Sequence, residues 1–271
     1  MFPHHKHEMH SVSPKQKAFL QSYQKRIRVI CYSRILLVLG FLILWEICAQ
    51  TGWINDFIFS SPSRMFICFL QAVKKQALFY HIAVTIGETL FSFFVVSTVS
   101  LFLAAMLWAC KTLYEILEPA LVMLNSLPKS ALAPVLIVWL GNNIKTVIVT
   151  GVLLAIFAST INLTTGFHKT DPDKIRLMQT LGAGKKDILF KLLIPSSIPL
   201  ILSTMKVNIG LCLVGVIIGE FMAARSGLGY LIIYSSQVFQ MDMVMLSILI
   251  LCIIAVVMYQ SVAFFNKKTP K

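Results

Sequence analysis

Long apolar runs, separated by short polar segments, dominate the chain from residue 29 onward. The runs lie at 29–49, 82–109, 116–140, 144–167, 198–223 and 243–265. Each run holds about 20 residues or more, enough for a helix to cross the roughly 30 Å of hydrocarbon in a bilayer. Only the tripeptide "GNN" separates the third run from the fourth, which predicts a tight reversal there. The pattern predicts an all-α, polytopic membrane protein with about six transmembrane helices.

The segments around the runs divide the chain into parts. We expect residues 1–28 to form a polar, basic tail. Residues 29–81 would hold the first transmembrane helix and an amphipathic segment that suits the membrane interface. Residues 82–265 contain the other five runs and, among them, the longest polar loop, 168–197. Residues 266–271 form a second short basic tail.

The composition agrees with a membrane protein. Of the 271 residues, 57% are hydrophobic and only 13% are charged, too few charges to cover a soluble protein of this length. A net charge of +13 could indicate nucleic-acid binding, but the chain has no basic helix or soluble module with interleaved aromatic residues. We therefore expect no nucleic-acid partner, and we interpret the basic residues as determinants of topology in the lipid bilayer.

The basic residues divide unevenly between the two sides of the membrane. If the N-terminus is cytoplasmic, seventeen lysines and arginines fall on the cytoplasmic side and five on the outer side. Two more, Lys129 and Lys206, lie within runs. This distribution satisfies the positive-inside rule. Because the number of spans is even, we expect both termini in the cytoplasm.

Histidine and cysteine do not predict a metal site. His4, His5, His7 and His10 cluster in the N-terminal tail and could bind a metal ion. No apolar periodicity surrounds them, so we interpret this stretch as disordered. The six cysteines are scattered without a C-x-x-C pair and suit small hydrophobic side chains. We expect no metal ligands and no cofactor bound by this chain.

The loop 168–197 predicts two short helices joined by a turn. Asp171 can cap the first helix, and Pro172 suits its first turn. Gly182 provides a stop, because glycine adopts the left-handed conformation at least cost. A second helix follows, and Pro195 precedes the return to the membrane. The apolar face of these helices needs cover, either from the ends of the chain's own spans or from a partner protein.

This loop carries a family resemblance. In "GAGKKDILFKLLIP", Pro195 follows Gly182 by thirteen residues, a spacing that resembles the EAA loop of ABC-importer permeases. Leu192 and Ile194 take the apolar positions that precede the proline in that pattern. The resemblance implies a coupling helix that is seated in a cleft of a separate ATPase subunit.

Two further stretches resemble segments of the same permease family, and one stretch differs from the family pattern. "LNSLPKSALAPVLIVWLGNN" (124–143) and "GVIIGEFMAARSGLGYLI" (215–232) resemble segments of the permeases for nitrate, sulfonate, taurine and related compounds. Arg176, Leu177 and Met178 stand where the EAA loop has Glu-Ala-Ala. The resemblance therefore implies that a charge contact made by the usual glutamate differs here.

The resemblance covers roughly residues 80–265 and implies a type I ABC-importer fold, in which 82–265 form the permease core. It implies the transmembrane subunit of an importer in a bacterial cell (plasma) membrane, for a small, anionic solute such as an aliphatic sulfonate, taurine or nitrate. The implied partners are a second permease (identical or paired), two copies of an ABC ATPase and an extracytoplasmic solute-binding protein.

The chain itself has no G-x-x-x-x-G-K-[ST] phosphate loop, so we expect no enzymatic activity here and ATP use by the partner subunit. The resemblance places the ATPase-coupling loop at Arg176, Thr180, Leu181, Gly182, Ala183, Gly184 and Pro195.

Residues inside the runs indicate where a solute would pass. Lys129 lies between Pro128 and Pro134, whose spacing predicts a bent or interrupted helix. Such breaks often line a cavity in transporters. Lys129 would attract an anion or pair with a neighbouring span. Glu220, near the end of the fifth run, would contact the solute or help to gate, or it would reach the outer interface or pair with Arg225.

Two other classes of protein are open to the sequence. A membrane enzyme would need a cluster of polar catalytic residues, but the remaining histidines, His81 and His168, are expected at opposite faces of the membrane. A stand-alone, ion-coupled secondary transporter would need more intramembrane carboxylates, and it would leave the EAA-like loop unexplained.

Overall fold

The computed structural model describes residues 14–74 and 77–267. This part of the chain is built from helices, without a strand, as the sequence predicts. It divides into two compact units, Met1–Arg64 and Met65–Lys271.

The first unit consists mainly of α1 (Pro14–Gln50), followed by α2 (Asp56–Phe59) and the first residues of α3 (Pro62–Lys74). Because α1 already begins at Pro14, residues 14–28 of the expected basic tail are helical and continue into the first span. The four N-terminal histidines lie outside the described residues. The apolar part of α1, Arg28–Gln50, agrees with the predicted first span.

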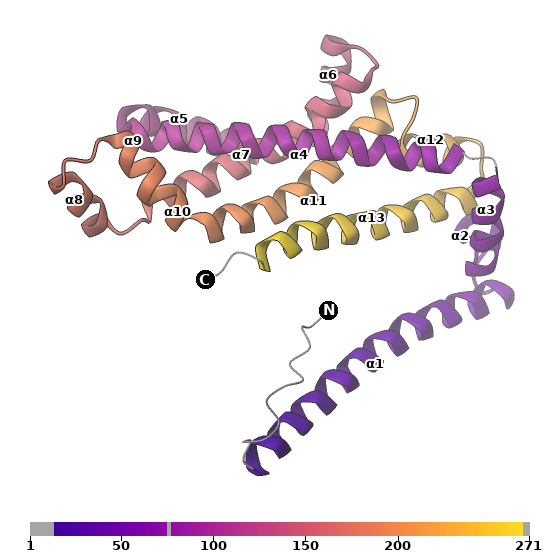
Figure 1. The fold of residues 1–271 in the computed structure, drawn as a ribbon. Coiled ribbons are helices and arrows are strands. Elements are labelled where there is room, and N and C mark those ends of the chain that lie inside the picture. The colour runs from indigo at the N-terminus through magenta and orange to yellow at the C-terminus, as the bar shows by residue number, and fades with distance from the viewer. Residues whose placement is uncertain (1–13, 75–76, 268–271) are drawn as a thin grey trace. The chain divides into compact units, whose positions relative to one another are not determined.

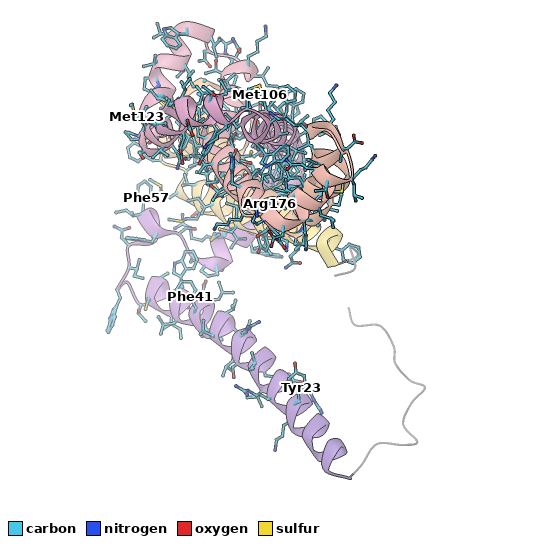
Figure 2. The ribbon with its side chains drawn as sticks, turned by 90° about the vertical axis from the view of Figure 1, so that its left-hand side faces the viewer. Tyr23, Phe41, Phe57, Met106, Met123 and Arg176 are labelled. Carbon is cyan, nitrogen blue, oxygen red and sulfur yellow. The ribbon has the colours of Figure 1, made fainter. Side chains whose placement is uncertain are left out.

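Four long helices form the body of the second unit. They are α4 (Ala77–Ala109), α7 (Ile144–His168), α11 (Ile198–Ala223) and α13 (Met241–Lys267), and they run side by side (Figure 1). Viewed along their axes, side chains fill the space between the helices (Figure 2). All four are long and apolar enough to cross a membrane, and each matches a predicted run within a few residues.

The third predicted run is not one straight helix. It comprises α5 (Lys111–Ser126), η1 (Lys129–Leu132) and α6 (Ala133–Leu140), and the chain bends by 85° between Ser126 and Lys129. The described residues therefore contain five helices able to cross a membrane, or six if this bent pair is one span. Pro128 lies at the bend, where proline cannot donate the backbone hydrogen bond that would continue the helix. The predicted interruption is confirmed.

Short helices lie at the two ends of the bundle (Figure 1). At one end are α8 (Pro172–Thr180), α9 (Lys185–Ile188), the π-helical η2 (Leu189–Leu193) and α10 (Ile194–Ser196). At the other end is α12 (Leu228–Gln237). The loop 168–197 thus forms two helical pieces joined by a turn, as predicted, although the sequence did not indicate the wider π turn.

Small residues allow α7 and α11 to pack closely. A Cβ atom on Gly215 of α11 would lie 2.7 Å from the Cα of Gly151 on α7. One turn further, a Cβ on Gly219 would lie 2.8 Å from the Cα of Val147. Glycines spaced four apart on a membrane helix permit such close backbone contact. The "GVIIG" stretch is therefore the face of α11 that packs on α7.

A buried polar chain joins three of the helices. Ser159 of α7 donates a hydrogen bond to Ser100 of α4 at 2.8 Å, and Asn208 of α11 donates to Ser159 at 2.9 Å. All three side chains are buried. In hydrocarbon, hydrogen bonds between helices add to van der Waals packing, so this chain of contacts holds α4, α7 and α11 together.

The substitution Gly215→Ala tests the close contact between α7 and α11. The added methyl group would overlap backbone atoms, so we expect destabilisation of about 1–3 kcal/mol, measured as a lower thermal unfolding temperature in detergent. Gly210→Ala is the matched control on the same helix, because no atom lies within 4 Å of its Cβ position. Equal unfolding temperatures for the two variants would contradict this account.

Candidate functional site

The turn between α8 and α9 has a defined hydrogen-bond geometry. The N–H of Gly182 donates to the carbonyl of Gln179, and the N–H of Ala183 donates to the carbonyl of Met178, each at 3.0 Å. This pair of bonds is a Schellman motif, which needs a left-handed residue just beyond the helix. Gly182 has φ +81° and fills that position. At the other end of α8, the Asp171 side chain accepts a hydrogen bond from the N–H of Asp173 at 3.0 Å. The predicted cap and stop are both confirmed.

The apolar residues of this segment divide into two groups. Leu193 is fully buried and packs with Ala104 of α4 and Phe167 of α7. In α8, by contrast, no side chain is buried, and Leu177 and Leu181 are 61% and 75% exposed. The chain's own spans therefore cover the second half of the segment, whereas the tip is left for a partner protein to cover.

Polar contacts fix the second half to the bundle. The ammonium group of Lys185 donates a hydrogen bond to the carbonyl of Ala109 at 3.0 Å, at the C-terminal end of α4, where free carbonyls favour a cation. Lys191 forms an ion pair with Asp187 at 2.7 Å. Hydrogen bonding to this lysine lowers the pKa of the exposed Asp187 carboxyl below its usual range. The segment is thus anchored at α9 while its tip stays free of the bundle.

The other predicted coupling residues lie around the same turn. The exposed Arg176 forms an ion pair at 3.6 Å with Asp173 on its own helix. Thr180 is exposed and donates a hydrogen bond to the carbonyl of Leu177 at 2.8 Å. Gly184 is the N-cap residue of α9, and Pro195 lies in the first turn of α10. Arg176 to Gly184 therefore form one exposed surface, whereas Pro195 lies where the chain returns to the bundle.

The bend at Pro128 exposes a lysine inside the third run. The ammonium group of Lys129 donates to the carbonyl of Asn125 at 2.9 Å and to its side-chain oxygen at 3.2 Å. Its hydrogen-bond partner thus lies on the preceding turn and not on a neighbouring span. Within the described residues Lys129 forms no ion pair with a carboxylate. Pro134 lies in the first turn of α6. Lys129 is half-buried, and the two oxygens that it bonds, both of Asn125, are neutral.

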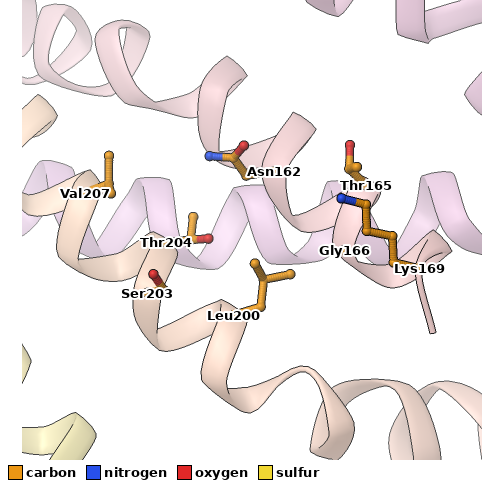
Figure 3. A pocket seen from close by; sticks show the side chains of 8 residues that line it. All are labelled: Asn162, Thr165, Gly166, Lys169, Leu200, Ser203, Thr204 and Val207. Carbon is orange, nitrogen blue, oxygen red and sulfur yellow. The ribbon is translucent and has the colours of Figure 1, made fainter. Parts of the chain in front are cut away.

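An open groove lies between α7 and α11, at the end that carries α8, and both polar and apolar side chains line it. It has a volume of about 330 Å³. Its lining residues are Asn162, Thr165, Gly166, Lys169, Leu200, Ser203, Thr204 and Val207. Figure 3 shows Asn162, Thr165 and Lys169 on the α7 side of this groove and Leu200, Ser203 and Thr204 on the α11 side. The hydrophobic pattern did not predict this groove, although the polar residues that recur within the fourth and fifth runs indicate it.

Glu220 lies at the opposite end of α11 and is 1% exposed. Its carboxylate accepts hydrogen bonds from the hydroxyl of Thr85 at 2.7 Å and from the N–H of Gly229 at 2.5 Å. The N–H of Tyr230 also donates to it. Arg225, considered from the sequence as a partner of Glu220, forms no ion pair with it among the described residues. Glu220 therefore supplies from α11 the oxygen that an N-cap residue would normally supply to α12.

Two more N–H groups at the start of α12, which have no partner within that helix, bond to side chains of α4. The N–H of Leu228 donates to the Thr85 hydroxyl at 2.8 Å, and the N–H of Gly227 donates to Nδ1 of His81 at 3.0 Å. Gly227 has φ +106°, and a Cβ there would overlap the Glu220 carboxyl group. "SGLG" is therefore the turn that lets α12 approach Glu220. That Glu220 contacts the solute stays a prediction.

A membrane transport subunit typically combines several membrane-spanning helices with an exposed turn for a partner and a groove with polar side chains. This chain has all three features. Comparison with known proteins specifies the family. Residues 97–269 match the family "Binding-protein-dependent transport system inner membrane component". The chain belongs to this family, and it is a multi-pass plasma-membrane protein of the ABC-importer permease class. Of the classes considered from the sequence, the ABC permease is confirmed.

Relatives of this chain bear several different transport names. A probable ABC transporter permease protein of Haemophilus influenzae is 28% identical, over 84% of this chain and 92% of its own length. The formylaminopyrimidine transport permease protein ThiX of Halalkalibacterium halodurans is 26% identical, over 72% and 77%. The putative aliphatic sulfonates transport permease protein SsuC of Bacillus subtilis is 23% identical, over 88% and 86%.

Solved structures support the fold. A chain of the MetNI methionine ABC transporter, in an inward-facing conformation, has a TM-score of 0.65 and 16% identity, and covers 72% of this chain and 97% of its own. A chain of a bacterial ABC transporter for the import of alginate has a TM-score of 0.65 and 13% identity, and covers 94% and 98%. The predicted importer-permease fold is confirmed.

The substitution Gly182→Ala tests the turn between α8 and α9. A left-handed backbone costs a residue with a side chain about 1–2 kcal/mol, which corresponds to roughly 5- to 30-fold faster local opening. We expect faster amide hydrogen exchange at residues 182 and 183. Gly184→Ala is the control, because Gly184 has φ −75° and its Cβ position meets only a side-chain oxygen at 3.9 Å. Similar exchange in both variants would show that the turn does not depend on Gly182.

Proposed function

We propose that this permease moves a small, anionic solute across the membrane, driven by a separate ABC ATPase that binds the α8–α9 tip. The observation that carries the proposal is the uncovered apolar tip itself. Its backbone is fixed by a Schellman motif, while Leu177 and Leu181 stay exposed. A rigid turn that presents apolar side chains is suited to insertion into a cleft of a partner protein.

Force applied at the tip would reach the bundle through a short path. η2 and α10 lead directly into α11, and Leu193 packs on α4 and α7. Lys185 adds a hydrogen bond to the end of α4. A displacement of the tip would therefore act on three core helices together. This arrangement suits a coupling element between ATP hydrolysis and a change in the orientation of the helices.

The partners follow from this mechanism. We propose that two permeases face each other, as a homodimer or as a pair, that each contacts one of two ATPase subunits, and that a solute-binding protein delivers the solute from outside. The short basic sequences at both ends support a cytoplasmic location for both termini.

The proposed charge of the solute rests on two lysines. The Lys129 ammonium group bonds only to neutral oxygens of Asn125, and Lys169 lines the groove between α7 and α11. Hydroxyl groups of Thr165, Ser203 and Thr204 line the same groove and could donate hydrogen bonds to anionic oxygens. Relatives named for aliphatic sulfonates, taurine and bicarbonate agree with an anion, and we favour an aliphatic sulfonate, taurine or nitrate.

The substitution Leu181→Asp tests the ATPase contact. A charge placed at an apolar contact would cost at least about 1.4 kcal/mol, a tenfold weaker complex. We expect co-purification with the ATPase to fall by that factor or more, with unfolding temperature unchanged, because this side chain is exposed. Leu181→Met is the control and would retain the complex. Full retention by Leu181→Asp would refute docking at this tip.

The substitutions Lys129→Gln and Lys169→Gln test the solute charge. Each removes a positive charge, so we expect at least several-fold slower uptake of taurine or an alkylsulfonate into proteoliposomes that contain the whole transporter. Lys145→Gln is the control, because this lysine is exposed at the start of α7, away from the groove. If the reconstituted transporter carried only uncharged heterocycles, the proposed solute class would be wrong, whereas the ATPase contact would stand.

A further inference from the structure

Glu88 and Glu220 form a pair of buried carboxyl groups at the α12 end of the bundle. Glu88 lies on α4 and is 5% exposed, and Glu220 lies on α11 and is 1% exposed. Thr85 lies one turn before Glu88 on α4 and donates a hydrogen bond to Glu220, so the two carboxyl groups lie on the faces of α4 and α11 that pack together. Two carboxylates cannot donate to each other, so a hydrogen bond between them requires a proton on one of the two.

The groups around the pair stabilise one negative charge but not two. The start of α12, with its free N–H groups, favours one carboxylate next to it. His81 adds no positive charge, because its Nδ1 accepts a hydrogen bond from the N–H of Gly227 and the ring is therefore neutral. Within the described residues, no lysine or arginine forms an ion pair with Glu88 or Glu220.

Other titratable groups lie at this end of the elements that pack around the pair. They are Tyr230 and Tyr234 on α12, Arg225 in the connection before it, Lys145 at the start of α7, Lys74 at the end of α3 and Asp242 in the first turn of α13. The side chains of Lys74, Lys145 and Arg225 are exposed to the surroundings of the bundle. A proton is therefore the available neutralising charge for the buried pair.

The hydrogen bonds assign the proton. Both oxygens of Glu220 accept, one from Thr85 and the other from Gly229, as an ionised carboxylate does. One oxygen of Glu88 has no hydrogen-bond partner. An ionised Glu88 would leave a buried charge with an unpaired oxygen, whereas a protonated Glu88 donates to Glu220 and carries no charge. We propose that Glu88 and Glu220 hold one proton between them, with Glu88 as the acid, and that this pair positions α12 on α4 and α11.

The proposal goes beyond the transport function and does not depend on the identity of the solute. Loss of the proton would place two carboxylates in contact inside the bundle. Their repulsion would weaken the hold on the first turn of α12, because the same Glu220 carboxylate bonds Gly229 and Tyr230. Attachment of α12 would therefore be complete while the proton is bound and would be lost as the pH rises.

Infrared spectroscopy of the purified permease in lipid nanodiscs tests the proton directly. The chain has only eleven aspartates and glutamates, so a buried protonated carboxyl gives a resolvable C=O stretching band, assigned by ¹³C-glutamate labelling. We expect the band at neutral pH in the wild type, its loss in Glu88→Gln, and its retention in the control Glu46→Gln. Absence of a labelled band in the wild type would overturn the proposal, even if the Glu88 variant failed to fold. Persistence of the band in folded Glu88→Gln would overturn it equally.

Amide hydrogen exchange in α12 tests the positioning role. Glutamine keeps an N–H donor to Glu220 without a titratable proton. We compare protection factors, that is, exchange rates corrected for the intrinsic rise of amide exchange with pH. We expect high protection of Gly229 and Tyr230 in Glu88→Gln at all pH values and lower protection in Glu88→Ala. In the wild type we expect protection that falls with pH as the infrared band disappears. High protection in Glu88→Ala, or the wild-type pH response in Glu88→Gln, would overturn the role of the pair.

Discussion

Inside a membrane, every backbone N–H and C=O must find its partner within the protein, because no water is present to replace it. Long helices meet this requirement along their length but leave free groups at each end. The permease meets it at these ends with side chains from other helices. Glu220 and Thr85 bond the start of α12, Lys185 bonds the last carbonyl of α4, and within the first unit Glu46 accepts a hydrogen bond from the N–H of Ser63 at 3.1 Å. Each contact fixes a short helix to a long one.

The same requirement explains why the two ends of the bundle behave differently. At the α12 end, side chains from α4 and α11 bond the first turn, and the turn is buried between them. At the α8 end, the segment bonds its own backbone through a Schellman motif and is anchored only from α9 onward. One end is thus integral to the bundle, and the other presents a preformed surface. This contrast is the physical basis for placing the ATPase contact at α8.

Helix packing determines where polar groups meet in the core. Because glycines bring α7 and α11 close at one end, the two helices are kept in a fixed register along their length. Ser159 and Asn208 then fall within hydrogen-bond distance. Beyond them, towards α8, polar residues of both helices line the groove that includes Lys169. Close packing and an open groove are therefore consequences of the same helix pair.

The sequence by itself determined the helices and the turn between α8 and α9, because hydrophobic length, Asp171 and Gly182 act locally. It also indicated the break at Pro128, since proline removes a bond of its own helix. The tertiary structure alone decided the contacts of Glu220 and Lys129 and the location of the groove between α7 and α11. Glu220 bonds the start of α12, which a sharp turn brings back to α11. Glu88 approaches Glu220 from α4, more than a hundred residues earlier in the chain. Partners of buried polar groups depend on which helix faces pack together, and a periodic pattern of apolar residues does not specify that choice.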